Sequence, residues 1–183
     1  MPFRIAIYCA SNADDVPAFV RGAEDLVDAI AERGLGIVYG GASVGLMGVV
    51  ARRALHRGVD VLGVLPRRLL DRELLMPDLK RTEIVDTMAE RKLLMSREAS
   101  AFIALPGAIG TLDEILEEWT TRYLGVHDKP IGFHDVAGYW RPFFTALESM
   151  RAAGVVRDAH MSIPVIDEDA RRLLDRMLGA RTG

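Results

Sequence analysis

Short apolar runs alternate along the whole chain with longer stretches whose apolar residues recur every three or four positions. The short runs are typical of buried strands, and the longer stretches are typical of amphipathic helices. Strands are predicted at residues 5–10, 35–39, 59–65, 81–85, 101–105, 130–133 and 162–166. Helices are predicted at residues 16–33, from the 40–48 loop to about 57, at 87–100, 111–124 and 139–153, and from 168 onward.

The order of these elements predicts an α/β fold. Apolar strands separated by helices indicate a parallel sheet covered on both faces, because parallel neighbours need crossover connections. We therefore expect one domain over residues 1–183, a Rossmann-like doubly wound parallel sheet. Ligands of such sheets bind beyond the carboxyl ends of the strands. That rule brings together four loops, at residues 9–14, 40–45, 66–73 and 106–111.

The most informative of these loops lies within residues 101–114, which read AFIALPGAIGTLDE. An apolar strand stops at Pro106, and a helical pattern begins at Thr111 after a glycine-containing turn. Such a junction aims backbone N–H groups and the positive end of a helix dipole at one point, which favours phosphate or another anion. The carboxylate of Glu114 follows one turn later, so an anion site and an acidic side chain are predicted to be neighbours.

Helix capping offers another interpretation of the same residues. Residues 111–114 and residues 87–90 both have the T-x-x-E spacing of a capping box, which alone would explain the threonines and glutamates. Capping does not explain Arg91 and Lys92, because cations in the first turns of a helix oppose its dipole. We interpret this pair as a candidate anion contact, with a solvated surface pair as the alternative.

The glycine-rich loop at residues 40–48 does not match a dinucleotide site. The G-x-G-x-x-G pattern is missing after the first strand, and no acidic residue follows at the distance that a ribose diol needs, so NAD binding is disfavoured. Gly40 and Gly41 allow close approach of a ligand to the backbone. Tight packing of strand against helix explains them equally well.

Composition excludes several classes of function. A formal net charge of −3 provides no broad basic field, so no nucleic-acid partner is expected. The only cysteine is Cys9, which argues against disulfides and for a reducing compartment, and the four histidines have no zinc-site spacing. No secretory leader and no stretch of membrane-spanning length is present, so we expect a cytoplasmic protein without a membrane partner.

Three motifs together resemble a known family. YGGASVGLMG at residues 39–48, MAERK at 88–92 and PGAIGTLDE at 106–114 are similar, in order and spacing, to the motifs of the Lonely Guy family of cytokinin riboside 5′-monophosphate phosphoribohydrolases. The similarity extends over nearly the whole chain. It implies a Rossmann-like fold, a nucleotide substrate, a homodimer, and no metal or organic cofactor.

The resemblance also assigns roles to individual residues. It implies that the 5′-phosphate is held by backbone N–H groups of Ala108 and Gly110 and by the Thr111 hydroxyl. Opposite this loop, Gly40 and Gly41 would shape the other wall of the site. Further family positions that contact substrate correspond to Lys92, Glu73 and Thr120.

Hydrolysis of an N-glycosidic bond needs a group that stabilises a positively charged ribose. As the base leaves, the anomeric carbon becomes oxocarbenium-like, and a fixed carboxylate stabilises it or activates water. Glu114 suits this catalytic role because its predicted place near a helix N-terminus favours the ionised form. Arg91 would position the substrate and add charge. The predicted reaction converts N6-substituted adenosine 5′-monophosphates to free base and ribose 5-phosphate.

Three alanines depart from the family pattern, at Ala42, Ala89 and Ala108. Ala108 replaces a glycine, which matters if the position needs a positive φ. Two alternatives therefore remain: binding of a nucleotide without catalysis, and cleavage of other nucleoside 5′-monophosphates. A pyridoxal-phosphate lysine decarboxylase is a third, for which Lys92 would be the candidate lysine. Candidates for the wall that contacts the base are Met88, Met95, Trp119 and Tyr123, with packing in the core or in a dimer interface as the alternative, which is preferred for Met95.

Overall fold

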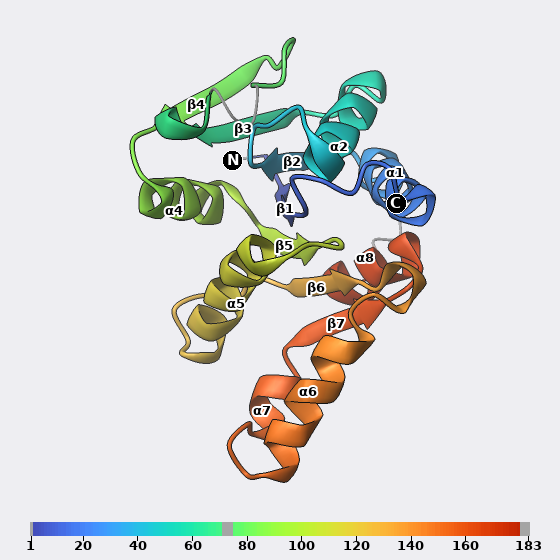
Figure 1. Cartoon of the computed structure of the whole chain (residues 1–183), viewed down its shortest axis with the longest axis vertical. Coiled ribbons are helices and arrows are strands. Elements are labelled where there is room, and N and C mark those ends of the chain that lie inside the picture. Colours follow the sequence, from blue (N-terminus) through green and yellow to red (C-terminus); the bar gives the residue numbers. More distant parts are fainter. Residues whose placement is uncertain (1, 71–74, 180–183) are drawn as a thin grey trace.

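The structure, a computed structural model, describes residues 2–70 and 75–179. Its strands form one parallel sheet in the order β4-β3-β2-β1-β5-β6-β7 (Figure 1). The strands are β1 (Arg4–Tyr8), β2 (Gly36–Tyr39), β3 (Val61–Pro66), β4 (Arg81–Val85), β5 (Ala101–Ala104), β6 (Ile131–His134) and β7 (Pro164–Asp167). The α-helices are α1 (Pro17–Glu32), α2 (Gly45–His56), α4 (Met88–Glu98), α5 (Ile109–Tyr123), α6 (Arg141–Ala152), α7 (Asp158–Met161) and α8 (Ala170–Leu178). Two 3-10 turns, η1 (Arg67–Leu69) and η2 (Val136–Gly138), complete the described elements.

The strand order confirms the predicted doubly wound architecture. From β1 the chain winds outward to β4, and it then returns to place β5 on the other side of β1. The order of strands therefore reverses between β1 and β5, which is the point where ligands of such sheets bind. Helices α1, α2 and α8 cover one face of the sheet, and α4, α5 and α6 cover the other (Figure 1).

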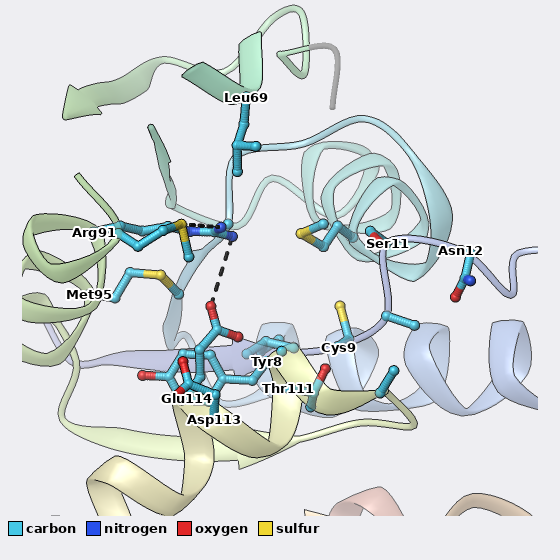
Figure 2. Close-up of a pocket in the computed structure, with 17 residues that line it drawn as sticks. Tyr8, Cys9, Ser11, Asn12, Leu69, Arg91, Met95, Thr111, Asp113 and Glu114 are labelled. Carbon is cyan, nitrogen blue, oxygen red and sulfur yellow. Dashed lines mark hydrogen bonds and ion pairs between the residues drawn. The ribbon is translucent and has the colours of Figure 1, made fainter. Parts of the chain in front are cut away.

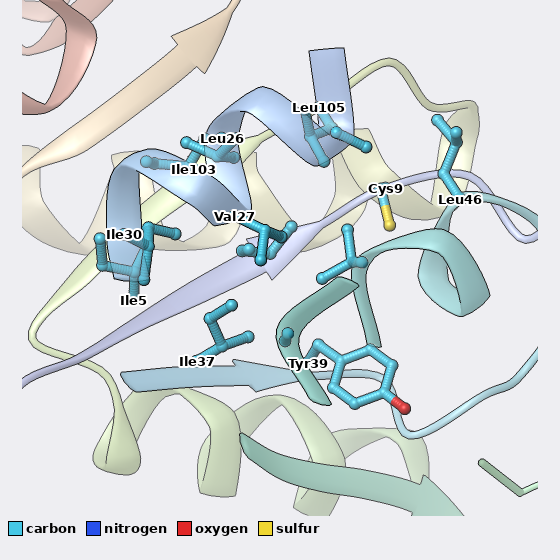
Figure 3. Close-up of a cluster of buried hydrophobic side chains, with 14 of the residues drawn as sticks. Ile5, Cys9, Leu26, Val27, Ile30, Ile37, Tyr39, Leu46, Ile103 and Leu105 are labelled. Carbon is cyan, nitrogen blue, oxygen red and sulfur yellow. The ribbon is translucent and has the colours of Figure 1, made fainter. Parts of the chain in front are cut away.

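Alternation along the strands builds two cores. In β1, Ile5 and Ile7 belong to the cluster under α1, α2 and α8 (Figure 3), whereas Ala6 and Tyr8 belong to the cluster under α4 and α5. Every residue of β1 is buried, as a central parallel strand requires. The central strands are thereby fixed in place, and their carboxyl ends can position a site.

The two predicted capping boxes have opposite outcomes. At α4 the prediction is confirmed, because the Thr87 hydroxyl accepts a hydrogen bond from the Glu90 N–H and the Glu90 carboxylate accepts one from the Thr87 N–H. At α5 the prediction is wrong. That helix begins at Ile109, its N-cap is Ala108, and no side chain caps it, so Thr111 lies inside the first turn.

The C-terminal third differs from the prediction in detail. Helix α6 begins at Arg141 and not at residue 139, because Ala137 (φ 53°) and Gly138 (φ 75°) turn the chain before it. The short helix α7 had not been predicted. None of the helices in the described residues is long and apolar enough to cross a membrane.

Candidate active site

A cavity of about 250 Å³ opens at the carboxyl ends of the central strands (Figure 2). Its walls come from the end of β1 and the loop after it, from Gly40 after β2, from Leu69 after β3, and from the start of α5 after β5. Helix α4 closes the remaining side. The four loops that the sheet rule brought together therefore meet at one place, as predicted, within the part of the chain that the structure describes.

The start of α5 forms one wall of this cavity. Ala108, Gly110 and Thr111 line it, and Thr111 is only 3% exposed. The first N–H groups of a helix have no acceptor within the helix, and here the N-cap side chain supplies none either. A bound anion can accept these hydrogen bonds and meet the positive end of the helix dipole.

Arg91 enters the cavity from α4. Its side chain is 7% exposed, its Nε has no hydrogen-bond partner among the described residues, and its Nη1 lies 3.9 Å from the Met88 sulfur. A buried guanidinium with an unsatisfied N–H is costly unless a partner arrives. A negatively charged or oxygen-rich ligand in the cavity would supply that partner.

Glu114 faces Arg91 across the cavity. The Glu114 Oε1 lies 3.9 Å from an Arg91 Nη atom, and the carboxylate side chain is 11% exposed (Figure 2). Because α5 begins at Ile109, Glu114 is the sixth helical residue, beyond the first turn in which the helix dipole acts strongly. The charge that Glu114 meets in the cavity is therefore that of Arg91, and the pair presents both signs to one ligand.

Gly40 is needed in the wall for a steric reason. A Cβ built at position 40 would lie 2.0 Å from an Arg91 Nη atom. Gly41 does not line the cavity. Its φ is +79°, and its carbonyl accepts a hydrogen bond from the Met76 N–H, so it shapes the loop behind the site.

Lys92 does not reach the cavity. Its ammonium lies 2.5 Å from a Glu117 carboxylate oxygen and 3.2 Å from one of Asp113, and these hydrogen bonds, led by Glu117, raise the pKa of Lys92. Thr120 is exposed and lines a different hollow, between α5, α6 and α7. The structure thus separates both residues from the site to which they were assigned. Glu73 lies outside the described residues.

The three departures from the family pattern leave the cavity open. Ala108 has φ −98°, a conformation that any residue adopts, so glycine is not required there. Ala89 is exposed and lines a surface hollow with Lys92, away from the cavity. Ala42 is fully buried behind the site and pairs with Leu75 in an isolated antiparallel bridge.

An apolar wall lies beside the two charges. Met88 and Met95, two of the four candidates for contacting the base, line the cavity, together with Met47 and Leu69, which the sequence had not indicated. The other two candidates lie elsewhere. The Trp119 indole N–H donates to the His160 carbonyl, and the Tyr123 ring stacks on the His160 ring, both beside the other hollow.

The end of β1 supplies the floor. Tyr8, Cys9, Ser11 and Asn12 line the cavity, and none of them had been proposed individually, although their loop had. Burial raises the pKa of the Cys9 thiol and that of the Tyr8 hydroxyl, so both carry their protons at neutral pH. A protonated Cys9 thiol is a poor nucleophile.

No lysine lines the cavity, although Lys80, Lys92 and Lys129, the three lysines of the chain, all lie in the described part. A pyridoxal phosphate enzyme needs a lysine at the cofactor to form the Schiff base. The residues present therefore do not fit that cofactor. The described residues also contain no group of three or more histidine, cysteine, aspartate or glutamate side chains that could hold a metal ion.

Two solved structures share this fold. The molybdenum cofactor carrier protein of Chlamydomonas reinhardtii superposes with a TM-score of 0.69 at 17% identity, covering 97% of this chain and 99% of that one. The molybdenum cofactor binding protein of Rippkaea orientalis gives a TM-score of 0.68 at 16% identity, covering 96% and 95%. At such identity the likeness concerns the fold alone.

Several proteins with known names are much more similar to this chain in sequence than these two structures are. A protein of Oryza sativa subsp. japonica, named as a probable cytokinin riboside 5′-monophosphate phosphoribohydrolase, is 41% identical over 95% of this chain and 78% of its own length. A cytokinin riboside 5′-monophosphate phosphoribohydrolase of Arabidopsis thaliana is 38% identical over 95% of this chain and 80% of its own length. The model of a family described as possible lysine decarboxylase matches residues 47–177. The chain therefore belongs to the Lonely Guy family, that of the cytokinin riboside 5′-monophosphate phosphoribohydrolases.

Proposed function

We propose that this protein hydrolyses the N-glycosidic bond of nucleoside 5′-monophosphates, N6-substituted adenosine 5′-monophosphates among them, to free base and ribose 5-phosphate. The names of its relatives support this reaction. The observation that carries it within the molecule is the burial of Glu114 and Arg91, 3.9 Å apart, beside an uncapped helix N-terminus. Phosphate and sugar would then be bound at adjacent places in one cavity.

The phosphate belongs at the start of α5. There Ala108, Gly110 and Thr111 line the cavity, so that their backbone N–H groups and the Thr111 hydroxyl would hold the phosphate, and the helix dipole adds its positive end. With the phosphate in this place, the ribose lies over Glu114, which is one turn beyond Thr111 on the same helix. The base then extends toward the apolar wall.

The chemistry rests on differential stabilisation of charge. As the bond from the anomeric carbon to the base nitrogen breaks, its electron pair leaves with the base and positive charge develops on the ribose. The carboxylate of Glu114 stabilises that charge and accepts a proton from the attacking water, whose oxygen forms the new bond to the anomeric carbon. The departing base takes up a proton from solvent, and Glu114 returns its proton to solvent, so that one water is added across the broken bond. Arg91 orients the ribose phosphate and holds Glu114 in place.

The second candidate function is hydrolysis of nucleoside 5′-monophosphates with a broader range of bases. The wall formed by Met47, Met88, Met95 and Leu69 is built of thioether and aliphatic groups, which recognise shape more than hydrogen-bonding pattern. Other nucleoside 5′-monophosphates therefore belong in the substrate panel. Their cleavage at comparable kcat/KM would favour this broader assignment.

We also propose that the protein forms a homodimer. Apolar side chains are exposed on and beside α4, among them Leu93 (52% exposed) and Val126 (72% exposed), and such side chains favour burial against a partner. Sedimentation equilibrium tests this proposal. A monomer over the whole accessible concentration range would contradict it.

The decisive experiment measures base release by chromatography. AMP and N6-isopentenyl-AMP are incubated with the wild type, with Glu114→Gln and with Arg91→Ala, and the parent nucleosides serve as substrates without phosphate. We expect each substitution to reduce kcat/KM by about 10²-fold or more. Nucleosides should be cleaved far more slowly than the monophosphates.

The matched control is Glu117→Gln. Glu117 lies three residues beyond Glu114 on α5, its side chain is 50% exposed, and it pairs with Lys92 outside the cavity. It should keep its activity. Thermal unfolding of all variants separates loss of catalysis from loss of fold, and full activity in Glu114→Gln would refute the assignment. A wild type that binds the nucleotides without releasing base would instead identify a binding protein.

A further inference from the structure

The loop before α5 is held from a distant part of the chain. The Tyr139 hydroxyl donates a hydrogen bond of 2.7 Å to the carbonyl of Gly107, which is 32 residues earlier. The Tyr139 ring is set edge-on against Phe19, with ring centroids 5.3 Å apart, and against Trp140, at 5.0 Å. These ring contacts keep the hydroxyl in position, and they do not depend on it.

The hydrogen bond from Tyr139 fixes the direction of the Gly107–Ala108 peptide plane. A trans peptide is planar, so its C=O and N–H groups point in opposite directions, and the described residues contain no cis peptide bond. The Gly107 carbonyl points to Tyr139, which does not line the cavity. The N–H of Ala108, in the same peptide, therefore points away from Tyr139, and Ala108 itself lines the cavity.

The preceding peptide is fixed as well. The Pro106 carbonyl accepts a hydrogen bond of 3.1 Å from the Ala10 N–H, so two consecutive carbonyls of the loop have donors outside it. Gly107 is needed between them because a Cβ there would lie 2.1 Å from the Thr111 hydroxyl oxygen. Glycine, however, also makes the backbone more permissive to rotation of the next peptide. The Tyr139 hydroxyl opposes that rotation.

We propose that Tyr139 is a positioning residue for the anion site, and that its hydroxyl keeps the Gly107–Ala108 peptide oriented with the Ala108 N–H toward bound phosphate. The inference rests on the proposed function in one respect, the placing of phosphate at the start of α5. Without the hydroxyl, the peptide can rotate and turn the Gly107 carbonyl toward the helix N-terminus, whose positive dipole end attracts it. The oxygen would then repel the phosphate.

The test is Tyr139→Phe in the full-length protein, which keeps the ring and removes one oxygen. Binding of ribose 5-phosphate and of inorganic phosphate is measured by calorimetry, and KM and kcat are measured with AMP and N6-isopentenyl-AMP. We expect Kd and KM to rise by about tenfold or more, as loss of a hydrogen bond to a charged group predicts. The value of kcat should change much less, since Glu114 and Arg91 are untouched.

Tyr123→Phe is the matched control. Like Tyr139, Tyr123 has its ring against a neighbouring ring, that of His160, and it lies outside the cavity. It should leave both ligand affinities unchanged. Circular dichroism establishes that the variants are folded. As a second readout, phosphate should shift the amide resonance of Ala108 in the wild type and shift it much less in Tyr139→Phe.

Binding measurements do not require turnover, so this proposal can fail separately from the proposed reaction. Wild-type affinity for ribose 5-phosphate in Tyr139→Phe would overturn it, as would a fall in kcat at unchanged KM. A wild type that binds neither phosphate ligand would also overturn it. If phosphate binding weakens as expected while the wild type releases no base, the positioning role stands and the hydrolase assignment fails.

Discussion

Gly40 and Arg91 share one small space, since a Cβ at residue 40 would lie 2.0 Å from an Arg91 Nη atom. The glycine therefore allows the guanidinium to lie where it faces Glu114. The contact is with the far end of a flexible side chain, so a larger residue would displace the guanidinium without unfolding the protein. This relationship gives the first prediction.

Gly40→Ala should fold and lose activity. Displacement of a positioning group by about 1 Å can cost on the order of 10²-fold in rate, and we expect a fall in kcat/KM of that size. Because the effect acts through Arg91, adding Gly40→Ala to Arg91→Ala should cost little more. Steady-state kinetics of the two single variants and the double variant form the test, and additive losses would show that Gly40 acts in another way.

Ala108→Gly should restore the glycine of the family pattern with little effect on activity. Ala108 has φ −98°, so the native backbone gains nothing from glycine. The unfolded chain gains conformational freedom, which should lower the free energy of unfolding by about 0.4–1 kcal/mol. Urea titration measures this difference. A large increase in kcat/KM would mean that the methyl group obstructs the phosphate.

Lys92→Ala should leave KM for the monophosphates close to that of the wild type, because Lys92 does not line the cavity and its ammonium pairs with Glu117, outside the cavity, and with Asp113, at its edge. Loss of these partly exposed pairs should cost at most about 1 kcal/mol of stability. The neighbouring substitution Arg91→Ala is the comparison and should reduce kcat/KM by about 10²-fold or more. A marked rise in KM for Lys92→Ala would return Lys92 to the site.

Asp167→Asn should destabilise the fold at neutral pH. The Asp167 side chain is 5% exposed and accepts hydrogen bonds from Arg172, from the Asp169 N–H and from Arg176, which together hold the pKa of Asp167 well below its usual range. We expect a loss of about 2 kcal/mol in the free energy of unfolding.

The pH dependence of that loss has a definite sign. Because the pKa of Asp167 is lower in the folded state, its stabilisation is present above the unfolded value of about 3.9 and declines as pH falls below it. Urea titrations of wild type and variant at pH 7, 5 and 3 should show the difference shrinking at pH 3. A difference that stays constant would contradict the ionic origin.

The spacing of apolar and polar residues predicted element bounds most reliably where the period of a strand or of a helix was clear. The strand at residues 81–85 was predicted with the bounds that β4 has, and the capping box at Thr87 was confirmed. At α5 the T-x-x-E spacing gave the wrong helix start, because the helix begins two residues earlier, at Ile109, and includes Gly110. A T-x-x-E sequence can occur at any position of a helix, so by itself it does not show where the first turn begins.

The cavity's apolar wall was harder to predict. Met47 lies on α2 and Leu69 ends η1, and in the sequence both look like ordinary core residues. Trp119 and Tyr123, in contrast, were plausible wall residues that pack around His160 beside another hollow. Which apolar side chain faces a ligand depends on how the helices pack over the sheet, and periodicity does not contain that information.

By itself, the sequence determined the alternation of strands and helices, the doubly wound parallel sheet, and the strand–loop–helix junction at residues 101–114 where an anion is predicted to bind. These depend on local spacing and on general rules for parallel sheets. Only the tertiary structure placed Arg91 in the cavity and Lys92 outside it. Consecutive residues on a helix point about 100° apart, so adjacent cations face different surroundings. Packing of α4 against β3, β1 and β2 turns Arg91 inward to Glu114 and leaves Lys92 outside with Glu117.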